Sequence, residues 1–316
     1  MLKNNGKMIV GRNFLFGLCV ICLMFTAFGL FVEESFAAEL NETVDEVGLE
    51  SNDINELENS QKNDVLEANS QDSSEVLGQQ RTPDGNTYAS IQNAINAANP
   101  GDTILLKDYY YSKGDPIKIY KPLTIISNSM ATMDGKHLSQ AFRVYEGAAG
   151  TVFKNIKFIN GEGNIGSGIV IFAKNVHIEN CIFEDNHANE GGAVQSEYDL
   201  NMAAGLIVDN CQFRRNTAYH PNIEEYSVAA ALAMFAKDSE VKNSIFEDNW
   251  VKGKYASYGG AIQVGLDLPG SIGKVTNCIF KNNRAISILE KSHGGAGCIR
   301  SGTSYTNCIF INNFAD

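Results

Sequence analysis

The stretch HIENCIFEDN, residues 177–186, decides the fold because five other stretches of the chain repeat its pattern. The other copies are FKNIKFING (153–161), IVDNCQFRRN (207–216), EVKNSIFEDN (240–249), KVTNCIFKNN (274–283) and SYTNCIFINN (304–313). Their leading asparagines follow one another at intervals of 25, 30, 33, 34 and 30 residues. A period of this length is typical of a repeat architecture, so the body of the chain is expected to consist of stacked, equivalent units.

Each copy predicts two short strands that meet at the leading asparagine. In residues 177–186, apolar residues alternate with polar ones before Asn180 and again after it, at Cys181 and Phe183. Asparagine tolerates the left-handed backbone region, so it can turn the chain while its side chain bonds the equivalent asparagine of the next unit. We therefore expect two structural ladders along the stack. Their members are Asn180, Asn210, Asn243, Asn277 and Asn307, and Phe183, Phe213, Phe246, Phe280 and Phe310.

A third strand per unit is predicted where glycines precede small and apolar residues. The sequence reads GGAV at 191–194, GGAI at 259–262 and GGA at 294–296, and AAAL at 229–232 replaces this motif in one unit. Three strands per unit make a triangular parallel coil. A propeller is the alternative, but each of its blades needs four strands and about 40 to 45 residues.

At this point the sequence resembles the right-handed parallel β-helix family, the pectin-lyase-like superfamily, over about residues 83–316. The GGA and NCIF repeats together with an acidic spacer look like the adhesin-like surface proteins of methanogenic archaea and, more distantly, polymorphic membrane-protein repeats. The expected fold is all-β, a right-handed single-stranded parallel β-helix (solenoid) with a short N-terminal capping helix.

The capping helix is expected within residues 86–101. Ile91, Ala94, Ile95 and Ala98 fall on one helical face, and the stretch NPGD at 99–102 ends the helix. Such an amphipathic helix would cover the open edge of the first coil. The last copy ends at residue 316 with no capping element, so we expect that the chain is a fragment or that another chain completes it.

Two segments are predicted before the β-helix. Residues 1–38 combine three bases, a long uncharged run and small residues near Ala37, as secretory signals do; an uncleaved membrane anchor is the alternative. Residues 39–82 are predicted to be a disordered acidic spacer, because 39–80 hold twelve acids and one base without aromatic residues. A marginal helix is the competing interpretation of the spacer. The body is therefore expected outside the cytosol, secreted or on the cell surface.

Composition and charge limit the classes of function. Hydrophobic residues make up 44% and charged residues 20% of the chain, which requires a globular part. The net charge of −12 disfavours the electrostatic binding that nucleic acids and anionic membranes require. We expect no nucleic-acid partner, and membrane association only through an uncleaved N-terminal segment.

Catalytic and metal-binding patterns are sparse. The acids of the EDN copies, at 184–185 and 247–248, are replaced by RR, KN and IN in other copies, so solvated corners explain them better than a carboxylate pair. Each of four arginines is as well explained as a surface charge, and the five histidines show no metal-ligand spacing. We expect no metal and no cofactor, and a catalytic role is disfavoured but open. The arginines are Arg214, Arg215, Arg284 and Arg300, and the histidines are His137, His177, His187, His220 and His293.

Cysteines occupy one position of the repeat. Cys181, Cys211, Cys278 and Cys308 are predicted to form a column of small buried side chains. Disulfides between neighbouring coils are the alternative, disfavoured because stacked parallel side chains point the same way. The GGA glycines lack the lysine and the helix of a phosphate-binding loop.

Aromatic residues in the loops that follow the closing asparagine are the remaining functional indication. Aromatic side chains are enriched at binding sites and stack on sugar rings, although ordinary packing also explains them. The family resemblance implies an adhesin-like protein that binds glycans or cell-surface proteins without catalysis. The alternative is a carbohydrate-active enzyme, a polysaccharide lyase or glycoside hydrolase, on the same fold. The candidate binding residues are Tyr219, Tyr226, Trp250, Tyr255 and Tyr258.

Overall fold

The computed structural model describes residues 78–199, 201–219, 226–265, 273–289, 291–299 and 302–316. The predicted signal segment and all of the predicted acidic spacer before residue 78 lie outside the described residues. No helix in the described part of the chain is long and apolar enough to cross a membrane.

Parallel strands stack coil upon coil and form three long sheets and one short sheet within the described residues. Sheet A contains β1 (Gln80–Arg81), β2 (Thr103–Leu106), β3 (Tyr109–Tyr111), β5 (Thr124–Asp134), β7 (Val152–Ile159), β10 (His177–Glu179), β11 (Ile182–Glu184), β14 (Ile207–Asp209), β15 (Gln212–Arg214), β19 (Ser239–Lys242), β20 (Ile245–Glu247), β24 (Gly273–Thr276), β25 (Ile279–Lys281), β29 (Thr303–Thr306) and β30 (Ile309–Ile311). Sheet B contains β4 (Ile117–Ile119), β6 (Phe142–Val144), β9 (Ile169–Ile171), β13 (Val194–Ser196), β18 (Leu232–Met234), β23 (Ile262–Val264) and β28 (Gly297–Ile299).

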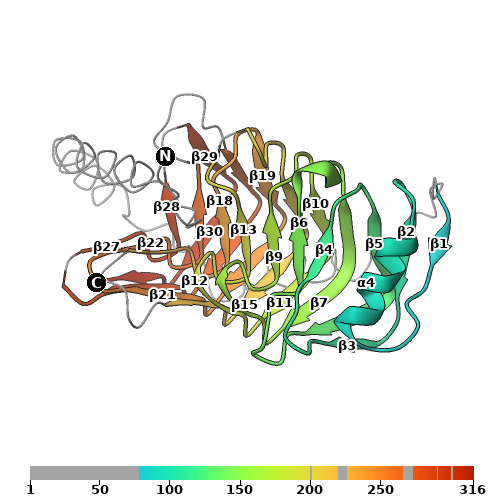
Figure 1. Cartoon of the computed structure of the whole chain (residues 1–316). Helices are drawn as coiled ribbons and strands as arrows, with labels where there is room; N and C mark the ends of the chain where they lie inside the picture. Colours follow the sequence, from blue (N-terminus) through green and yellow to red (C-terminus); the bar gives the residue numbers. More distant parts are fainter. Residues whose placement is uncertain (1–77, 200, 220–225, 266–272, 290, 300–301) are drawn as a thin grey trace, which may run out of the picture. The chain divides into compact units, whose positions relative to one another are not determined.

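The other two sheets lie between sheets A and B along the chain. Sheet C contains β8 (Glu162–Ile165), β12 (His187–Glu190), β16 (Thr217–Tyr219), β21 (Trp250–Gly253), β26 (Arg284–Ser287) and β31 (Phe314–Ala315). The short sheet D contains β17 (Ser227–Val228), β22 (Ser257–Tyr258) and β27 (Ser292–His293). Figure 1 shows neighbouring strands of sheet B side by side, in the order expected when each coil adds one strand to sheet B. The prediction of a parallel β-helix is confirmed, and the propeller alternative is wrong.

Each coil bends sheet A at the leading asparagine, which separates strands such as β10 and β11. Asn180 has a φ of 52°, in the left-handed region, and Asn210 Nδ2 donates a hydrogen bond to Asn180 Oδ1 at 2.7 Å. The ladder is interrupted one coil later, where Asn243 Nδ2 donates to Asp209 Oδ1 at 2.9 Å instead. The phenylalanine rings stack without interruption and are buried as far as Phe280, whereas Phe310 at the last coil is exposed. Their centroids lie 4.8 Å apart for Phe183–Phe213 and Phe213–Phe246, 4.9 Å for Phe246–Phe280 and 5.0 Å for Phe280–Phe310.

A second asparagine ladder, formed by the closing residues of the copies, is buried. Asn216 Nδ2 donates to Asn249 Oδ1 at 3.0 Å, and Asn249 Nδ2 donates to Asn283 Oδ1 at 2.9 Å. The same amide oxygen of Asn249 also accepts from the Asn216 backbone N–H at 3.0 Å. Each side chain therefore satisfies the backbone at the corner between sheets A and C, where a buried polar group without a partner is costly.

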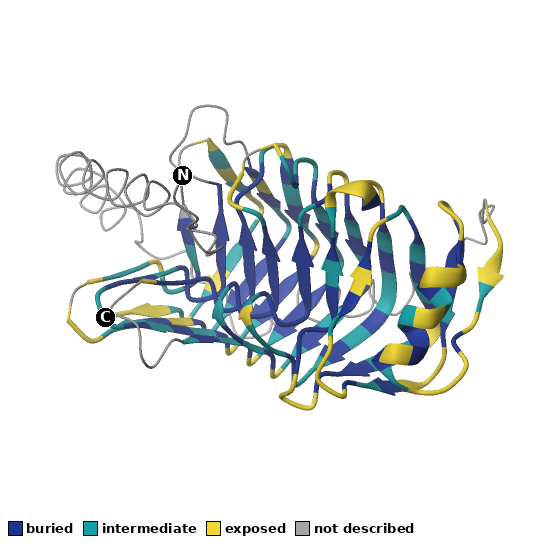
Figure 2. Ribbon diagram, viewed as in Figure 1, coloured by how far each residue is buried: buried dark blue, intermediate teal, exposed yellow. Residues whose placement is uncertain are grey.

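Helix α4 (Tyr88–Ala97) is shorter than the predicted range 86–101: a reciprocal cap between Thr87 and Ser90 sets its start, and the extended backbone of Ala98 ends it. Its residues Ile91 and Ile95 are buried, and the helix packs against β2 and β4. Figure 2 shows a buried inner face and an exposed outer face on this helix. The β-structure begins earlier than predicted, since β1 pairs with β2 inside the range assigned to the spacer. The reason is Asp102, whose carboxylate accepts from the backbone N–H of Gln79 at 2.9 Å.

The glycine motifs lie at the entrance to sheet B. Gly191 has a φ of 56°, whereas Ala229 takes the equivalent place with a φ of 44°. The second glycine is required by close packing, because a Cβ at Gly192 would lie 1.6 Å from the carbonyl oxygen of Ala230. Ala229 therefore holds a backbone conformation that costs a non-glycine residue free energy.

The cysteines of the repeat carry free thiols. Cys181, Cys211 and Cys278 are buried and Cys308 is half-buried. The structure therefore has the predicted column of small side chains, and the disulfide alternative is wrong for these four residues.

Candidate functional site

Two of the predicted aromatic residues meet on the outer face of sheet C. In the pairing register of β16 and β21, Thr217 lies opposite Trp250 and Tyr219 lies opposite Lys252. The ring centroids of Tyr219 and Trp250 are 6.2 Å apart, with planes inclined by 37°. The amine of Lys252 lies 5.5 Å from the centre of the Tyr219 ring, which is within the range of a cation–π contact.

The other three predicted aromatic residues lie elsewhere. Tyr226 and Tyr258 pack together beside sheet D with ring centroids 5.9 Å apart, and the His293 ring stacks on Tyr258 at 4.9 Å. Tyr255 occupies the turn between β21 and β22, where the amine of Lys254 lies 5.5 Å from its ring centre. The five residues therefore form two clusters and a turn.

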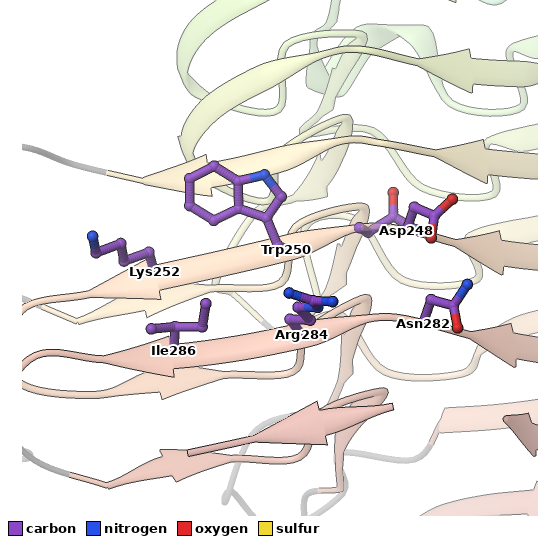
Figure 3. A pocket seen from close by; sticks show the side chains of 7 residues that line it. Asp248, Trp250, Lys252, Asn282, Arg284 and Ile286 are labelled. Atoms are coloured by element: carbon purple, nitrogen blue, oxygen red, sulfur yellow. The ribbon is translucent and has the colours of Figure 1, made fainter. Parts of the chain in front are cut away.

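A surface pocket of about 470 Å³ lies beside Trp250. In Figure 3, Trp250 and Lys252 project from one strand, and Arg284 and Ile286 project from the next. The register explains this arrangement, because Trp250 lies opposite Arg284 and Lys252 opposite Ile286. Side chains two residues apart on a strand point to the same face, so all four share the outer face of sheet C. The full lining is Asp248, Asn249, Trp250, Lys252, Asn282, Arg284 and Ile286.

The charges of the pocket differ from those on the outer face of sheet A. On sheet A, desolvation alone would raise the pKa of Glu184, but its hydrogen bonds to Lys157 and Arg215 outweigh this and lower the pKa. Comparable ion pairs neutralise most cations of that face. They are Lys154–Glu179 at 2.9 Å, Arg214–Glu247 at 3.6 Å, Arg215–Asp185 at 2.8 Å, Lys242–Asp209 at 3.5 Å and Lys281–Glu247 at 3.7 Å.

In the pocket, by contrast, Lys252 and Arg284 form no ion pair with a carboxylate of the described residues. Asp248 is the one acid of the lining, and its side chain likewise forms no ion pair there. The described pocket thus offers two uncompensated cations, one carboxylate and one indole ring. This combination suits a ligand that carries both carboxylates and the apolar faces of rings.

Three residues of the pocket, Lys252, Asn282 and Ile286, carry no motif that singles them out in the sequence. Asp248 was predicted to lie at a solvated corner and Arg284 to be a surface charge, whereas both line the pocket. The signal was present in the repeat, since residues one and three positions after each closing asparagine must point outward on the next strand. Counting one and three positions from Asn249 and Asn283 gives the four outward side chains Trp250, Lys252, Arg284 and Ile286.

Among the remaining candidates for chemistry, His187 has side-chain partners, whereas Nε2 of His177 is buried without a hydrogen-bond partner in the described structure. His187 Nδ1 lies 2.7 Å from Thr217 Oγ1, and its Nε2 lies 3.8 Å from a carboxylate oxygen of Glu162. Across the described ranges, no group of three or more His, Cys, Asp or Glu residues is placed to hold a metal ion. Arg300 and His220 lie outside the described residues.

The family model described as "Right handed beta helix region" matches residues 140–315, more than half of the chain. The chain belongs to the right-handed β-helix family. The match confirms that the chain resembles right-handed parallel β-helix proteins, as its repeats predicted. No curated protein is significantly similar to this family member in sequence.

Solved structures that are similar to the β-helix protein include two alginate lyases. One is described as "Structure of PL6 family alginate lyase AlyGC"; it has a TM-score of 0.38 and 12% identity, and the match covers 76% of this chain and 38% of that one. The other is an alginate lyase from Paenibacillus sp. str. FPU-7, with a TM-score of 0.35 and 13% identity, and the match covers 74% of this chain and 98% of that one. The chain thus spans less than half the length of the first structure.

One expectation from the sequence is corrected here. The β-helix protein was expected to be an adhesin that binds without catalysis, whereas the structures to which it is similar are lyases, which are enzymes. The adhesin expectation is therefore corrected and is not taken further.

Proposed function

We propose that the protein is an enzyme that acts on an acidic polysaccharide, which it binds at the pocket on the outer face of sheet C. The observation that carries the proposal is the placement of Trp250 beside Lys252 and Arg284, two cations without a carboxylate partner in the described structure. An indole face stacks on the apolar face of a sugar ring. A guanidinium and an ammonium group bind the carboxylates of uronic acid residues through charge-assisted hydrogen bonds.

The chemistry of the lining favours elimination over hydrolysis. Hydrolysis of a glycosidic bond generally uses two carboxyl groups about 5 to 9 Å apart, and the described lining contains one, Asp248. In β-elimination, cations neutralise the uronate carboxylate and so acidify the adjacent C–H bond. A base takes that proton, a carbon–carbon double bond forms, and the bond to the leaving glycosidic oxygen breaks as that oxygen gains a proton. We assign Lys252 and Arg284 to carboxylate neutralisation and Asp248 to proton removal.

The proposal is tested by incubating the full chain with alginate, pectate and neutral dextran. Alginate is chosen because the two similar structures are alginate lyases. The expected result is ultraviolet absorbance from unsaturated chain ends with an acidic polymer and none with dextran. New reducing ends without unsaturation would instead indicate hydrolysis and overturn the elimination step, and no product with any acidic polymer would overturn the enzyme proposal.

Variants separate the pocket from the rest of the surface. Trp250→Ala and Arg284→Ala are expected to lower both binding and turnover at least tenfold, because each removes a contact to the bound polymer. Asp248→Asn is expected to lower turnover with a smaller effect on binding. Lys174→Ala is the matched control, since Lys174 is an exposed cation in a turn between sheets B and A. Equal losses in Lys174→Ala would show that net charge, and not the pocket, controls the activity.

We further propose that the protein works outside the cytosol, either secreted or attached to the cell surface. The composition of residues 1–38 supports this location, as does the likeness of the repeats to surface proteins of methanogenic archaea. Mass spectrometry of the secreted protein is expected to find an N-terminus near residue 38. Retention of the intact chain in the cytosolic fraction would contradict the proposal.

A further inference from the structure

One aliphatic side chain, Ile286, lines the pocket together with the two cations. On sheet C, the outward row that contains Lys252 and Ile286 begins with polar or amphipathic residues, namely Asn164, Asn189 and Tyr219. Ile286 breaks this pattern at the pocket wall. Ile288 and Leu289 follow it in the chain, and their side chains are 56% and 59% exposed.

We name Ile286, Ile288 and Leu289 the aliphatic strip. Single exposed apolar residues are ordinary on protein surfaces, but here Ile286 lines the pocket and two exposed aliphatic residues, Ile288 and Leu289, follow it within three positions of the chain. The strip continues the pairing of β26 with the neighbouring coil, because the Ile288 N–H donates to the Gly253 carbonyl at 3.2 Å. Its position is therefore set by the same backbone that positions Lys252 and Arg284.

The geometry points to an O-acetylated acidic polysaccharide as the ligand, with acetyl methyl groups against the aliphatic strip. This inference rests on the proposed function. A ligand that contacts both the two cations and the aliphatic strip must carry anionic groups for Lys252 and Arg284. It must also carry small apolar groups close to those anionic groups. A methyl ester does not fit, because esterification removes the carboxylate charge that Lys252 and Arg284 bind. An acetyl ester on a hydroxyl group adds a methyl group and leaves the carboxylate charged.

The size of the effect follows from the burial of one methyl group. Removing a methyl or methylene group from water is worth about 0.8 kcal/mol, and 1.4 kcal/mol corresponds to a tenfold change in affinity. One acetyl methyl buried against the strip should therefore raise the affinity about fourfold.

The test is a fluorescence titration of the full chain with acetylated alginate and with the same preparation after deacetylation. Trp250 is the only tryptophan in the sequence and lines the pocket, so its emission reports binding there. The wild-type protein is expected to bind the acetylated polymer about fourfold more tightly. Ile286→Ser and Ile288→Ser are each expected to bring this ratio toward one. Ile182→Ser is the matched control on sheet A and should retain the ratio.

The outcomes distinguish this inference from the proposed function. Equal affinity of the wild-type protein for both polymers would overturn the role of the strip and leave the proposed function standing. Failure to bind either polymer would overturn both. A fourfold affinity ratio that persists in the double variant Ile286→Ser/Ile288→Ser would reject the role of the aliphatic strip in binding acetyl groups. Tighter binding to vesicles of anionic phospholipid than to either polymer would also reject it. Circular dichroism of each variant verifies that the β-helix is intact.

Discussion

Removal of the Asn249 side chain tests whether the buried asparagine ladder holds the coils together. Asn249 is completely buried, and its amide bridges two neighbouring coils. The change Asn249→Ala removes hydrogen bonds from four groups: the Asn216 backbone N–H, one N–H of the Asn216 amide, the Phe213 carbonyl, and Asn283 Oδ1, which keeps its bond from the Asn249 backbone N–H. Each buried polar group left unpaired costs about 1 to 3 kcal/mol, and the carbonyl can retain a second bond. We therefore expect the free energy of unfolding to fall by about 3 to 5 kcal/mol.

The assay is urea unfolding followed by far-ultraviolet circular dichroism, which reports the whole β-helix and not only the surroundings of Trp250. Asn243→Gly is the matched control, because Asn243 is exposed, has a φ of 51°, and glycine adopts that conformation without strain. The control removes two exposed side-chain hydrogen bonds, one to Asp209 and one from Asn277, and should lose less than about 2 kcal/mol. A loss in Asn249→Ala no greater than in this control would refute the claim that the buried ladder is a major source of stability.

Three further predictions concern stability. Ala229→Gly should stabilise the protein by about 0.5 to 1 kcal/mol in thermal unfolding, because relief of a left-handed alanine outweighs the added entropy of the unfolded chain; a lower melting temperature would contradict this. Phe246→Ala should destabilise it by about 3 to 5 kcal/mol, since the ring is fully buried between two stacked rings 4.8 and 4.9 Å away, and a loss below 1 kcal/mol would show that the column repacks. The pKa of Glu184 is lowered in the folded state, so its stabilising contribution is present above the unfolded pKa of about 4.3 and is lost as the pH falls through the folded value. Glu184→Gln should therefore reduce the fall in the free energy of unfolding as the pH is lowered through that acidic range. If the variant loses stability at low pH as steeply as the wild-type protein, other groups cause the acid sensitivity.

The repeat predicts the architecture because its residues act on the backbone locally. Asn180 and its equivalents bend each coil through a left-handed backbone, and Phe183 and its equivalents fill the interior, so spacing alone indicates both the corners and the stack. The interruption at Asn243 was not predictable from the repeat. It depends on Asp209, whose carboxylate competes for the amide and which the alignment places outside the ladder.

The site was less accessible to sequence reasoning than the fold. Trp250 and Tyr219 stand out as aromatic residues, and the structure places them together, but Lys252 and Ile286 have no distinctive motif. Their significance arises from register, because only the pairing of β21 with β26 brings them opposite each other. The absence of a carboxylate beside Lys252 in the described structure is likewise a three-dimensional property that composition does not reveal.

The contrast between adjacent columns of the β-helix explains why the chemistry is concentrated at one pocket. The buried column that contains Asn249 is asparagine in five successive coils, because each side chain must bond the next one. The outward column one residue later forms no ladder of hydrogen bonds that would require the same residue type in every coil. Its residues are Glu162, His187, Thr217, Trp250, Arg284 and Phe314. A substitution in this outer column leaves the winding of the coil intact, so a stack of equivalent coils can hold non-equivalent chemistry. The pocket occupies the two coils where an indole and a guanidinium become neighbours, and this local pairing, not the fold shared by every coil, is the basis of the activity we propose.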